Sequence, residues 1–565
     1  MKPPRPRLLA WCLLACLALP ACASPLVPSA EEEEADPPEV AVGERLFQET
    51  RFAQFFFAHS GGQINSPLAQ GDPVMDLTEA IGQELPGPFA GQSMNCAACH
   101  MVDQQLQAPG GGMRSYGDFA RRSPIPQRED GRTTAPRNSP PLVNSALPRA
   151  NDLFLHFDGE FTSLEDLVRG TFTGRNFGWL PGEAPQAVAN LAKVIREDDG
   201  SDAIANLLGF SGWSYRALLG GADPNLPPDF LLPEEFRIDV DAASDQEIFD
   251  AVARLVAAYV RNLVFSQNQQ GEFNGSPYDK FLILNDLPRK PAAGESDLEY
   301  SRRLMRALQE LKEVQFVDPA ARQFQFHEQD FAFGPEELAG MKIFFREPDA
   351  IPLGSEKILA GGIGNCIACH AAPNFTDFSF HNVGTAQREY DKIHGQGSFS
   401  ALSIPGFAAR SADPEAFLPP TAAHPGGTGV FLAVPAADRP GHTDLGVWNV
   451  FGNADIPKPQ AALRELLCRR VTDPNAGCTA EELLPLSIAL FKTPGLRDLG
   501  HSSPYMHTGQ LDGLDSVLMH YFQFSAKARE GAMRNSPPEF QGMALRQDEL
   551  PDLLKFLKSL NEDYN

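Results

Sequence analysis

A five-residue pattern that occurs twice constrains the fold of this chain more than any other feature. Cys-x-x-Cys-His stands at residues 96–100 and again at residues 366–370. In this pattern two thiols bond covalently to a haem, and the histidine that follows is placed to ligate the iron. A redox dithiol or half of a zinc site does not need that histidine. The sequence therefore predicts two covalent c-type haems, held by Cys96, Cys99, His100, Cys366, Cys369 and His370.

The N-terminus has the pattern of an export signal, with basic residues before a short apolar run at residues 8–19. That run is too short to cross a bilayer as a stable helix. Residues 1–23 are therefore expected to be a signal peptide. Residues 19–22 resemble a bacterial lipobox, which would leave a lipid anchor on Cys22, and ordinary signal cleavage after the small-x-small pattern at 21–23 is the alternative. Either way we expect a bacterial protein of the periplasm, or an exported lipoprotein on the membrane.

Two further cysteines, Cys468 and Cys478, lie ten residues apart late in the chain. Export of c-type haem proteins places them in an oxidising compartment, where a local disulfide is expected. Two free buried thiols are the alternative. The formal net charge of −26 makes nucleic acid an unsuitable partner and favours a neutral or basic protein partner.

The pattern of apolar residues predicts a mostly α fold, because helical spacing recurs and no run of alternating strands stands out. The helices expected are 162–169, 185–195, 245–265, 302–314, 335–345 and 550–560. A helix precedes each haem motif, one expected near residues 42–52 and one at 335–345, which indicates a weak internal repeat. Residues 24–38, acidic and proline-containing, are expected to be a disordered tether. We predict two cytochrome c-like domains with long irregular loops, at 39–290 and 291–565, each with one covalent haem.

Several segments beyond the haem motifs resemble the bacterial di-haem cytochrome c peroxidase family, including its MauG-type branch, which oxidises a protein substrate. They are Arg-Asn-Ser-Pro at 137–140, Phe-Lys-Thr-Pro-Gly-Leu-Arg at 491–497 and Pro-Tyr-Met-His-Thr-Gly at 504–509. The resemblance runs from about Val42 to the C-terminus, with insertions. It implies that the His100 haem meets hydrogen peroxide and that the His370 haem passes electrons to it. A small redox protein, a cytochrome c or a cupredoxin, would supply those electrons.

The same resemblance implies further ligands. In the peroxidase branch a Met ligates the second iron, and in the MauG-type branch a Tyr does. The matching position here is Tyr521, fourteen residues after His507, and Met519 faces roughly 160° away on a helix. A packed core aromatic is the alternative for Tyr521. A calcium site is also implied, formed by Asn138 and the carbonyls of Ser502 and Pro504, since oxygen ligands suit calcium.

The chain departs from the family around the first haem. Phe157 replaces the inter-haem Trp, which puts electron hopping through that side chain in doubt. No Glu matches the usual distal Glu, so His156, Arg175 and Glu183 are the candidates for moving the proton that O–O cleavage needs. His156 is the first to test, and a structural hydrogen-bonded His is its alternative. Tyr116 stands where the peroxidase branch has a removable distal His.

Three functions follow from these observations. The leading one is an exported di-haem peroxidase that reduces hydrogen peroxide to water. A MauG-type oxidase acting on a protein or organic substrate is the second, and Tyr521 supports it. A non-catalytic di-haem electron carrier is the third. Arginines between residues 109 and 141 are candidates to pair with haem propionates, or else form a solvated basic loop: Arg114, Arg121, Arg122, Arg128, Arg132 and Arg137.

Overall fold

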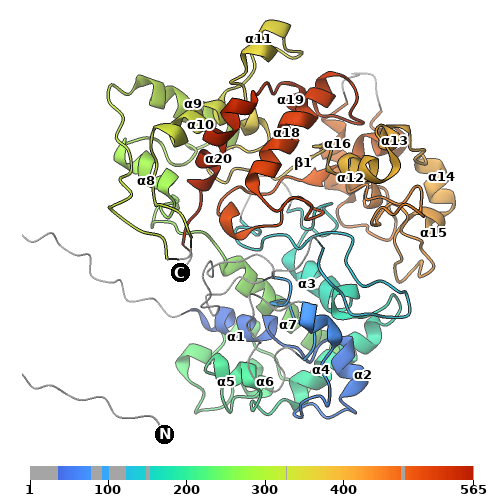
Figure 1. The fold of residues 1–565 in the computed structure, drawn as a ribbon. Coiled ribbons are helices and arrows are strands. Elements are labelled where there is room, and N and C mark those ends of the chain that lie inside the picture. The colour runs from blue at the N-terminus through green and yellow to red at the C-terminus, as the bar shows by residue number, and fades with distance from the viewer. Residues whose placement is uncertain are drawn as a thin grey trace, which may run out of the picture. The chain divides into compact units, whose positions relative to one another are not determined.

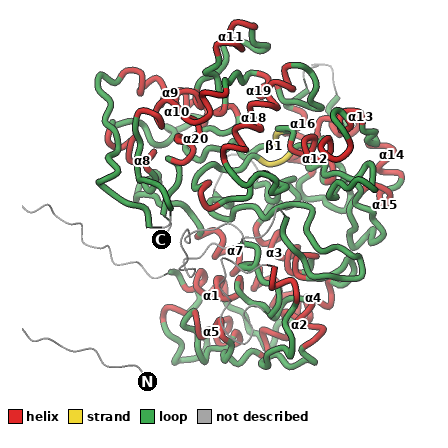
Figure 2. Tube along the Cα trace, in the orientation of Figure 1, coloured by secondary structure: helices red, strands yellow, loops and turns green. Residues whose placement is uncertain are grey.

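Helices and long loops make up the part of the chain that the computed structural model describes, which is residues 36–77, 92–100, 122–147, 153–325, 327–471 and 477–563 (Figure 2). The described strands are β1 (Phe380–His381) and β2 (Phe491–Lys492), paired antiparallel with Phe380 opposite Lys492. The mostly α prediction is therefore confirmed. Residues 1–23 with Cys22, nearly all of the tether at 24–38, and Arg114, Tyr116 and Arg121 lie outside the described residues.

A long central helix, α7 (Asp245–Asn262), organises the first hydrophobic cluster, and Figure 1 shows it among α1, α3 and α4. Ser244 and Glu247 form a capping box that starts α7, and its apolar face is buried. Gly43 of α1 is required here, because a Cβ would lie 2.2 Å from the Leu255 carbonyl oxygen. The helices of this part are α1 (Pro38–Phe47), α2 (Gln54–His59), α3 (Leu164–Phe172), α4 (Ala184–Glu197), α5 (Ala203–Leu207) and α6 (Tyr215–Gly220).

The second cluster is built around α10 (Pro335–Phe345) and α20 (Leu550–Lys558), which pack against each other. Phe344, Phe375 and Phe556 meet there, with ring centroids 5.1 to 6.1 Å apart. The other helices of this part are α8 (Pro277–Leu284), α9 (Asp297–Glu310), α11 (Ser355–Ala360), α18 (Leu514–Arg529) and α19 (Pro538–Gln541). Helix α9 begins five residues before the expected 302 because Ser296 and Glu299 form its capping box.

A third hydrophobic cluster, around the buried Trp448, was not anticipated from the sequence. It carries α12 (Thr385–His394), α13 (Ser398–Ala401), α14 (Phe407–Ala412), α15 (Pro414–Phe417), α16 (Gln460–Cys468) and α17 (Ala480–Leu483). Phe154, from the N-terminal half of the chain, also belongs to it. The domain limits 39–290 and 291–565 stay a prediction, although the buried residues of the first cluster end at Phe273 and those of the second begin at Tyr278.

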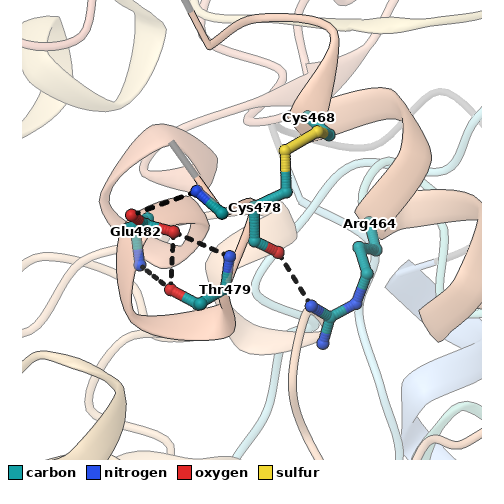
Figure 3. Close-up of a disulfide and its surroundings, with 6 residues drawn as sticks. Arg464, Cys468, Cys478, Thr479 and Glu482 are labelled. Carbon is teal, nitrogen blue, oxygen red and sulfur yellow. Dashed lines mark hydrogen bonds between the residues drawn. A yellow bond between two sulfur atoms is a disulfide. The ribbon is translucent and has the colours of Figure 1, made fainter. Parts of the chain in front are cut away.

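The expected disulfide between Cys468 and Cys478 is present, with Cα atoms 5.5 Å apart (Figure 3). It joins the end of α16 to the residue before the Thr479 cap of α17. Arg464 of α16 donates a hydrogen bond of 2.8 Å to the Cys478 carbonyl, and Thr479 and Glu482 form a capping box. Among the described residues, no helix combines the length and the apolar character that crossing a membrane requires.

Candidate functional site

The first Cys-x-x-Cys-His motif lies next to the C-terminal end of α1 in space, although other elements separate the two in sequence. The Cys96 N–H donates to the Phe47 carbonyl at the end of that helix, and the Asn95 amide donates to the Gln48 carbonyl. The motif then turns on itself, since the His100 N–H donates to the Cys96 carbonyl at 2.8 Å. Cys96 and His100 line a largely apolar cavity of about 1420 Å³, its mouth included. Residues of α3 and α7 form other parts of the wall.

The second motif is held in the same way beyond α10. The Gly364 N–H donates to the Ile343 carbonyl in the last turn of α10, and the His370 N–H donates to the Cys366 carbonyl. Cys366, Cys369 and His370 line a second cavity, of about 1620 Å³ with its mouth. In both cases a backbone hydrogen bond therefore connects the segment of the haem motif to the C-terminal end of a helix, in agreement with the internal repeat in the sequence.

The chemistry of these walls fits a covalently held haem. None of the four motif cysteines is in a disulfide, and burial raises the pKa of each thiol, that of Cys99 to about 12, so all four are neutral near pH 7. Burial also lowers the pKa of His370, which keeps its imidazole neutral. The His370 Nδ1–H donates to the Phe375 carbonyl at 2.8 Å. That bond leaves Nε2 as the nitrogen that can ligate a metal.

Tyr521 of α18 lines the same cavity as His370, whereas Met519 does not. Burial raises the pKa of the Tyr521 phenol, so its oxygen ionises only beside a positive charge such as a metal ion. Met506 and His507 also line this cavity and were not considered as ligands from the sequence. His507 is buried, and its Nε2 has no hydrogen-bond partner among the described residues. The signal that could have singled them out was their place in the Tyr-Met-His segment.

The two cavities share part of their walls. Phe157, Lys492 and Pro494 line both, and the Lys492 N–H donates to the Phe157 carbonyl at 2.8 Å. Phe157 contacts the His507 ring edge-on, with centroids 6.2 Å apart, and His507 stacks on Phe491 at 3.5 Å. Phe157 thus lies in the wall that the two cavities share, and the rings of His507 and Phe491 continue from it along the second cavity.

The three candidates for proton transfer lie in different surroundings. His156 lines the first cavity, and its Nδ1 is 3.2 Å from Glu160 Oε2. Arg175 and Glu183 do not line it. Arg175 Nε is paired with Asp130 at 2.8 Å, and Glu183 Oε1 with Arg128 Nη2 at 2.9 Å.

The Arg128 hydrogen bond holds the pKa of Glu183 below its usual range, which makes this carboxyl a poor proton donor near neutral pH. Of the three candidates, only His156 lines the first cavity. Its neighbour Glu160, which sequence reasoning missed, stands four residues after it. In Glu160 burial opposes ionisation, but the hydrogen bond with His156 and the nearby charges of His156 and Arg137 together outweigh burial and lower the pKa of the carboxyl.

The residues implied for calcium lie together. Asn138, Ser502 and Pro504 all line the second cavity, and the Asn138 N–H donates to the His507 carbonyl at 2.7 Å. The Asn138 Nδ2 donates to the Pro504 carbonyl at 2.8 Å, while its buried Oδ1 has no partner among the described residues. Turning the amide over would direct Oδ1 toward the Pro504 oxygen, an arrangement that only a cation stabilises.

The arginines proposed to meet propionates are paired with carboxylates instead where the structure describes the pairing. Arg122 bonds Glu389, Arg128 bonds Glu183, and Arg137 bonds both Asp158 and Asp444. None of the described members of this set lines either cavity. Lys492, which lines both cavities, is the basic residue that the sequence argument overlooked.

A helical chain with two neighbouring apolar cavities, each lined by thiol and imidazole groups of its own Cys-x-x-Cys-His motif, fits the class of di-haem redox proteins. No family model matches the chain. A segment of 73 residues is 40% identical to the methylamine utilization protein MauG of Methylorubrum extorquens and covers 13% of this chain and 19% of that protein. A segment of 92 residues is 30% identical to the cytochrome-c peroxidase IdrP1 of Denitromonas iodatirespirans, covering 16% and 23%.

MauG of Methylophilus methylotrophus is 41% identical over 71 residues, covering 13% of this chain and 20% of that protein. Among solved structures, the diheme peroxidase BthA of Burkholderia thailandensis aligns with 95% of this chain and 89% of its own, at 16% identity and a TM-score of 0.43. A MauG-like protein associated with microbial copper homeostasis aligns over 94% and 91%, at 15% identity and a TM-score of 0.40.

The segment matches confirm the resemblance of this chain to the MauG-type di-haem peroxidase family. The matched segments span about a fifth of the length of these curated relatives. The activities of the relatives are therefore proposals for this chain.

Proposed function

We propose that this chain is an exported di-haem c-type peroxidase that reduces hydrogen peroxide to water. The observation that carries the proposal is the pair of neighbouring cavities, each with a Cys-x-x-Cys-His motif in its wall and with Phe157 lining both. Reducing one peroxide to two waters takes two electrons and two protons. Two adjacent redox groups suit a protein that receives electrons singly from a small donor, such as a cytochrome c or a cupredoxin.

The two cavities would have different tasks, one in each of the cytochrome c-like domains at 39–290 and 291–565. The cysteines of each motif would hold the haem, and His100 and His370 would ligate the irons. The haems, when bound, supply iron that exchanges electrons with the donor and with peroxide. Tyr521 would be the second ligand on the His370 side, whereas the His100 side would keep a face for peroxide.

His156 is the residue of this chain that we assign to proton transfer. Its contact with Glu160 through Nδ1 fixes the imidazole ring and leaves Nε2 to exchange a proton with peroxide. The alternative for His156 is a structural role, in which it only fixes the loop before Phe157.

The test is steady-state peroxide consumption by the haem-loaded protein with reduced cytochrome c as donor. His156→Ala should lower kcat by about 10²–10⁴-fold, the range typical of losing a general acid–base group. The matched control is His424→Ala, which also removes a His paired with one carboxylate, Asp455 at 2.8 Å, but lines neither cavity. The assignment fails if both variants keep wild-type kcat. The peroxidase proposal itself fails if the wild type consumes no peroxide with any reduced donor.

A second function, a MauG-type oxidase of a protein or organic substrate, is favoured by one observation. Tyr521, and not Met519, lines the cavity of the His370 motif, and an oxygen ligand suits oxidised iron better than a thioether does. Two curated relatives also carry the name MauG. Peroxide consumption that needs a protein substrate, and that reduced cytochrome c does not support, would favour this function over the first.

Export and calcium are part of the proposal. Mass spectrometry of the mature N-terminus would distinguish a lipid-modified Cys22 from ordinary signal cleavage, and an unprocessed N-terminus would refute both. For calcium, Asn138 Oδ1 with the Ser502 and Pro504 carbonyls would supply three oxygen ligands. The ion would join the loop at 137–140 to the segment at 502–504, and both segments contribute to the second cavity.

A further inference from the structure

Three metal-ligating side chains meet outside the two Cys-x-x-Cys-His motifs, and one of them, Asp498, also lines the first cavity. They are His327, Asp498 and His501, and their side chains are only 5%, 1% and 3% exposed. Asp498 and His501 belong to the short 3₁₀ turn at Leu499–His501 and its cap. His327 comes from a loop at 321–330 whose other described residues are exposed or half-buried. A surface loop thus directs one imidazole inward to a buried carboxylate.

The geometry of the three groups is that of a ligand set. One ligand atom from each residue lies within 4.8 Å of the other two. Asp498 Oδ2 is 2.9 Å from His501 Nδ1, and Oδ1 is 2.8 Å from His327 Nε2. The two imidazole rings are stacked, with their centroids 4.0 Å apart.

One contact in the cluster is not an ordinary hydrogen bond. Although Asp498 Oδ1 is close to His327 Nε2, it accepts no hydrogen bond of acceptable geometry from any described residue. The His327 nitrogen is instead aligned with the Glu562 carbonyl, at 3.2 Å. A buried carboxylate oxygen 2.8 Å from an imidazole nitrogen, without a well-aligned hydrogen bond between them, fits two neighbouring ligands of one cation.

We propose that His327 Nε2, the Asp498 carboxylate and His501 Nδ1 bind one divalent transition-metal cation, with Zn²⁺ as its representative. Two imidazoles and one carboxylate suit borderline cations, whereas calcium prefers oxygen alone. A water molecule or the Glu562 carbonyl would fill the fourth position of a tetrahedral site. The cation would compensate the buried charge of Asp498, which is costly without a positive partner.

The role of such a site would be structural. It would join three segments: the loop at 321–330, the C-terminal tail at Glu562, and the turn at 498–502. That turn leads into the walls of both cavities, since Ser502 lines each of them. The inference does not depend on the peroxidase proposal, because the three ligands lie outside the haem motifs and bind without any turnover.

The experiment measures zinc binding by the haem-loaded protein after treatment with a chelator. Zinc sulfate is titrated against a competing chelator, and bound metal is counted by elemental analysis. We expect one tightly bound Zn²⁺ per chain. Loss of a residue that only supports a ligand typically weakens metal binding by about 10–100-fold. Because His327 and His501 would bind the metal directly, His327→Gln or His501→Gln should weaken zinc binding at least about 100-fold. The matched control His424→Gln, from the single His–carboxylate pair with Asp455, should bind as the wild type does.

A second measurement on the wild type keeps the proposal falsifiable if a variant fails to fold. Zinc-edge X-ray absorption of the loaded protein should show imidazole scattering from two histidines. The proposal is overturned if the wild type binds no zinc more tightly than the His327→Gln and His501→Gln variants. It is equally overturned if the bound zinc shows no imidazole ligands. In either outcome the three residues only interact with one another through hydrogen bonds and ion pairs and bind no metal.

Discussion

Replacing Arg137 by Met would leave two buried carboxylates without their cation. Arg137 Nε lies 2.6 Å from one oxygen of Asp444 and Nη2 lies 2.9 Å from the other, while Nη1 lies 2.6 Å from Asp158 Oδ2. The side chains of Asp158 and Asp444 are 4% and 2% exposed. Asp158 directly follows Phe157 in the shared wall, and Asp444 belongs to the segment of the third hydrophobic cluster. Arg137 therefore ties the wall between the cavities to that cluster.

The size of the effect follows from this burial. Removing one partner of a buried ion pair costs about 3–5 kcal/mol, because the remaining charge stays away from water. Arg137 itself is 12% exposed, which reduces the loss of stability, whereas leaving two carboxylates without a cation increases it. We expect Arg137→Met to lower the free energy of unfolding by about 4 kcal/mol at pH 7. Arg137→Lys should recover only part of it, since an ammonium cannot bond Asp444 at two points.

The dependence on pH has a definite sign. In Asp444 burial raises the pKa, but Arg137 outweighs burial and the pKa lies below its ordinary value. Its stabilisation is therefore present above about pH 4, the ordinary pKa of Asp, and is lost as the pH falls through the folded-state pKa. In Asp158 burial prevails and the pKa is raised, so its favourable contribution is lost as the pH rises. The deficit of Arg137→Met should be largest near pH 7 and shrink toward pH 4.

The assay is urea unfolding followed by circular dichroism at pH 7 and pH 5, in a double-mutant cycle with Asp444→Asn. The control is Arg128→Met, whose partner Glu183 is 28% exposed, and it should cost no more than about 1 kcal/mol. A loss below about 1 kcal/mol for Arg137→Met, or an Arg137–Asp444 coupling under about 0.5 kcal/mol, would refute the reasoning.

Three more outcomes are expected. Tyr521→Met should change the absorption spectrum of the His370 haem and leave that of the His100 haem unaltered, and an unchanged spectrum would show that Tyr521 is not a ligand. Replacing Cys468 and Cys478 by Ser should lower the free energy of unfolding by about 2–3 kcal/mol, as the short loop between them predicts, and equal urea midpoints would contradict this. Asn138→Ala should abolish any rise in melting temperature that calcium gives the chelator-treated protein, and the same rise in both proteins would place the ion elsewhere.

Local sequence patterns determined much of this molecule. The spacing of Cys96, Cys99 and His100 is contained in five residues, so the haem prediction needed no knowledge of packing. Helix α7 could be predicted because its capping box and its apolar stripe are both local. Helix α9 was placed too late because the apolar pattern was followed and the Ser296–Glu299 capping box was not.

Which polar residues line the cavities depends on the tertiary structure and could not be predicted from the sequence. The sequence offered Arg175 and Glu183 as candidates alongside His156, but Asp130 and Arg128 hold them in ion pairs outside the cavity wall. Those partners lie more than forty residues away, so no local pattern shows them. The joining of His327 to Asp498 likewise spans a long stretch of chain. The sequence alone determined that the chain carries two haem-attachment motifs, because each motif is contained in five consecutive residues. Contacts between distant segments determined which charged side chains are neutralised in ion pairs and which side chains line the cavities.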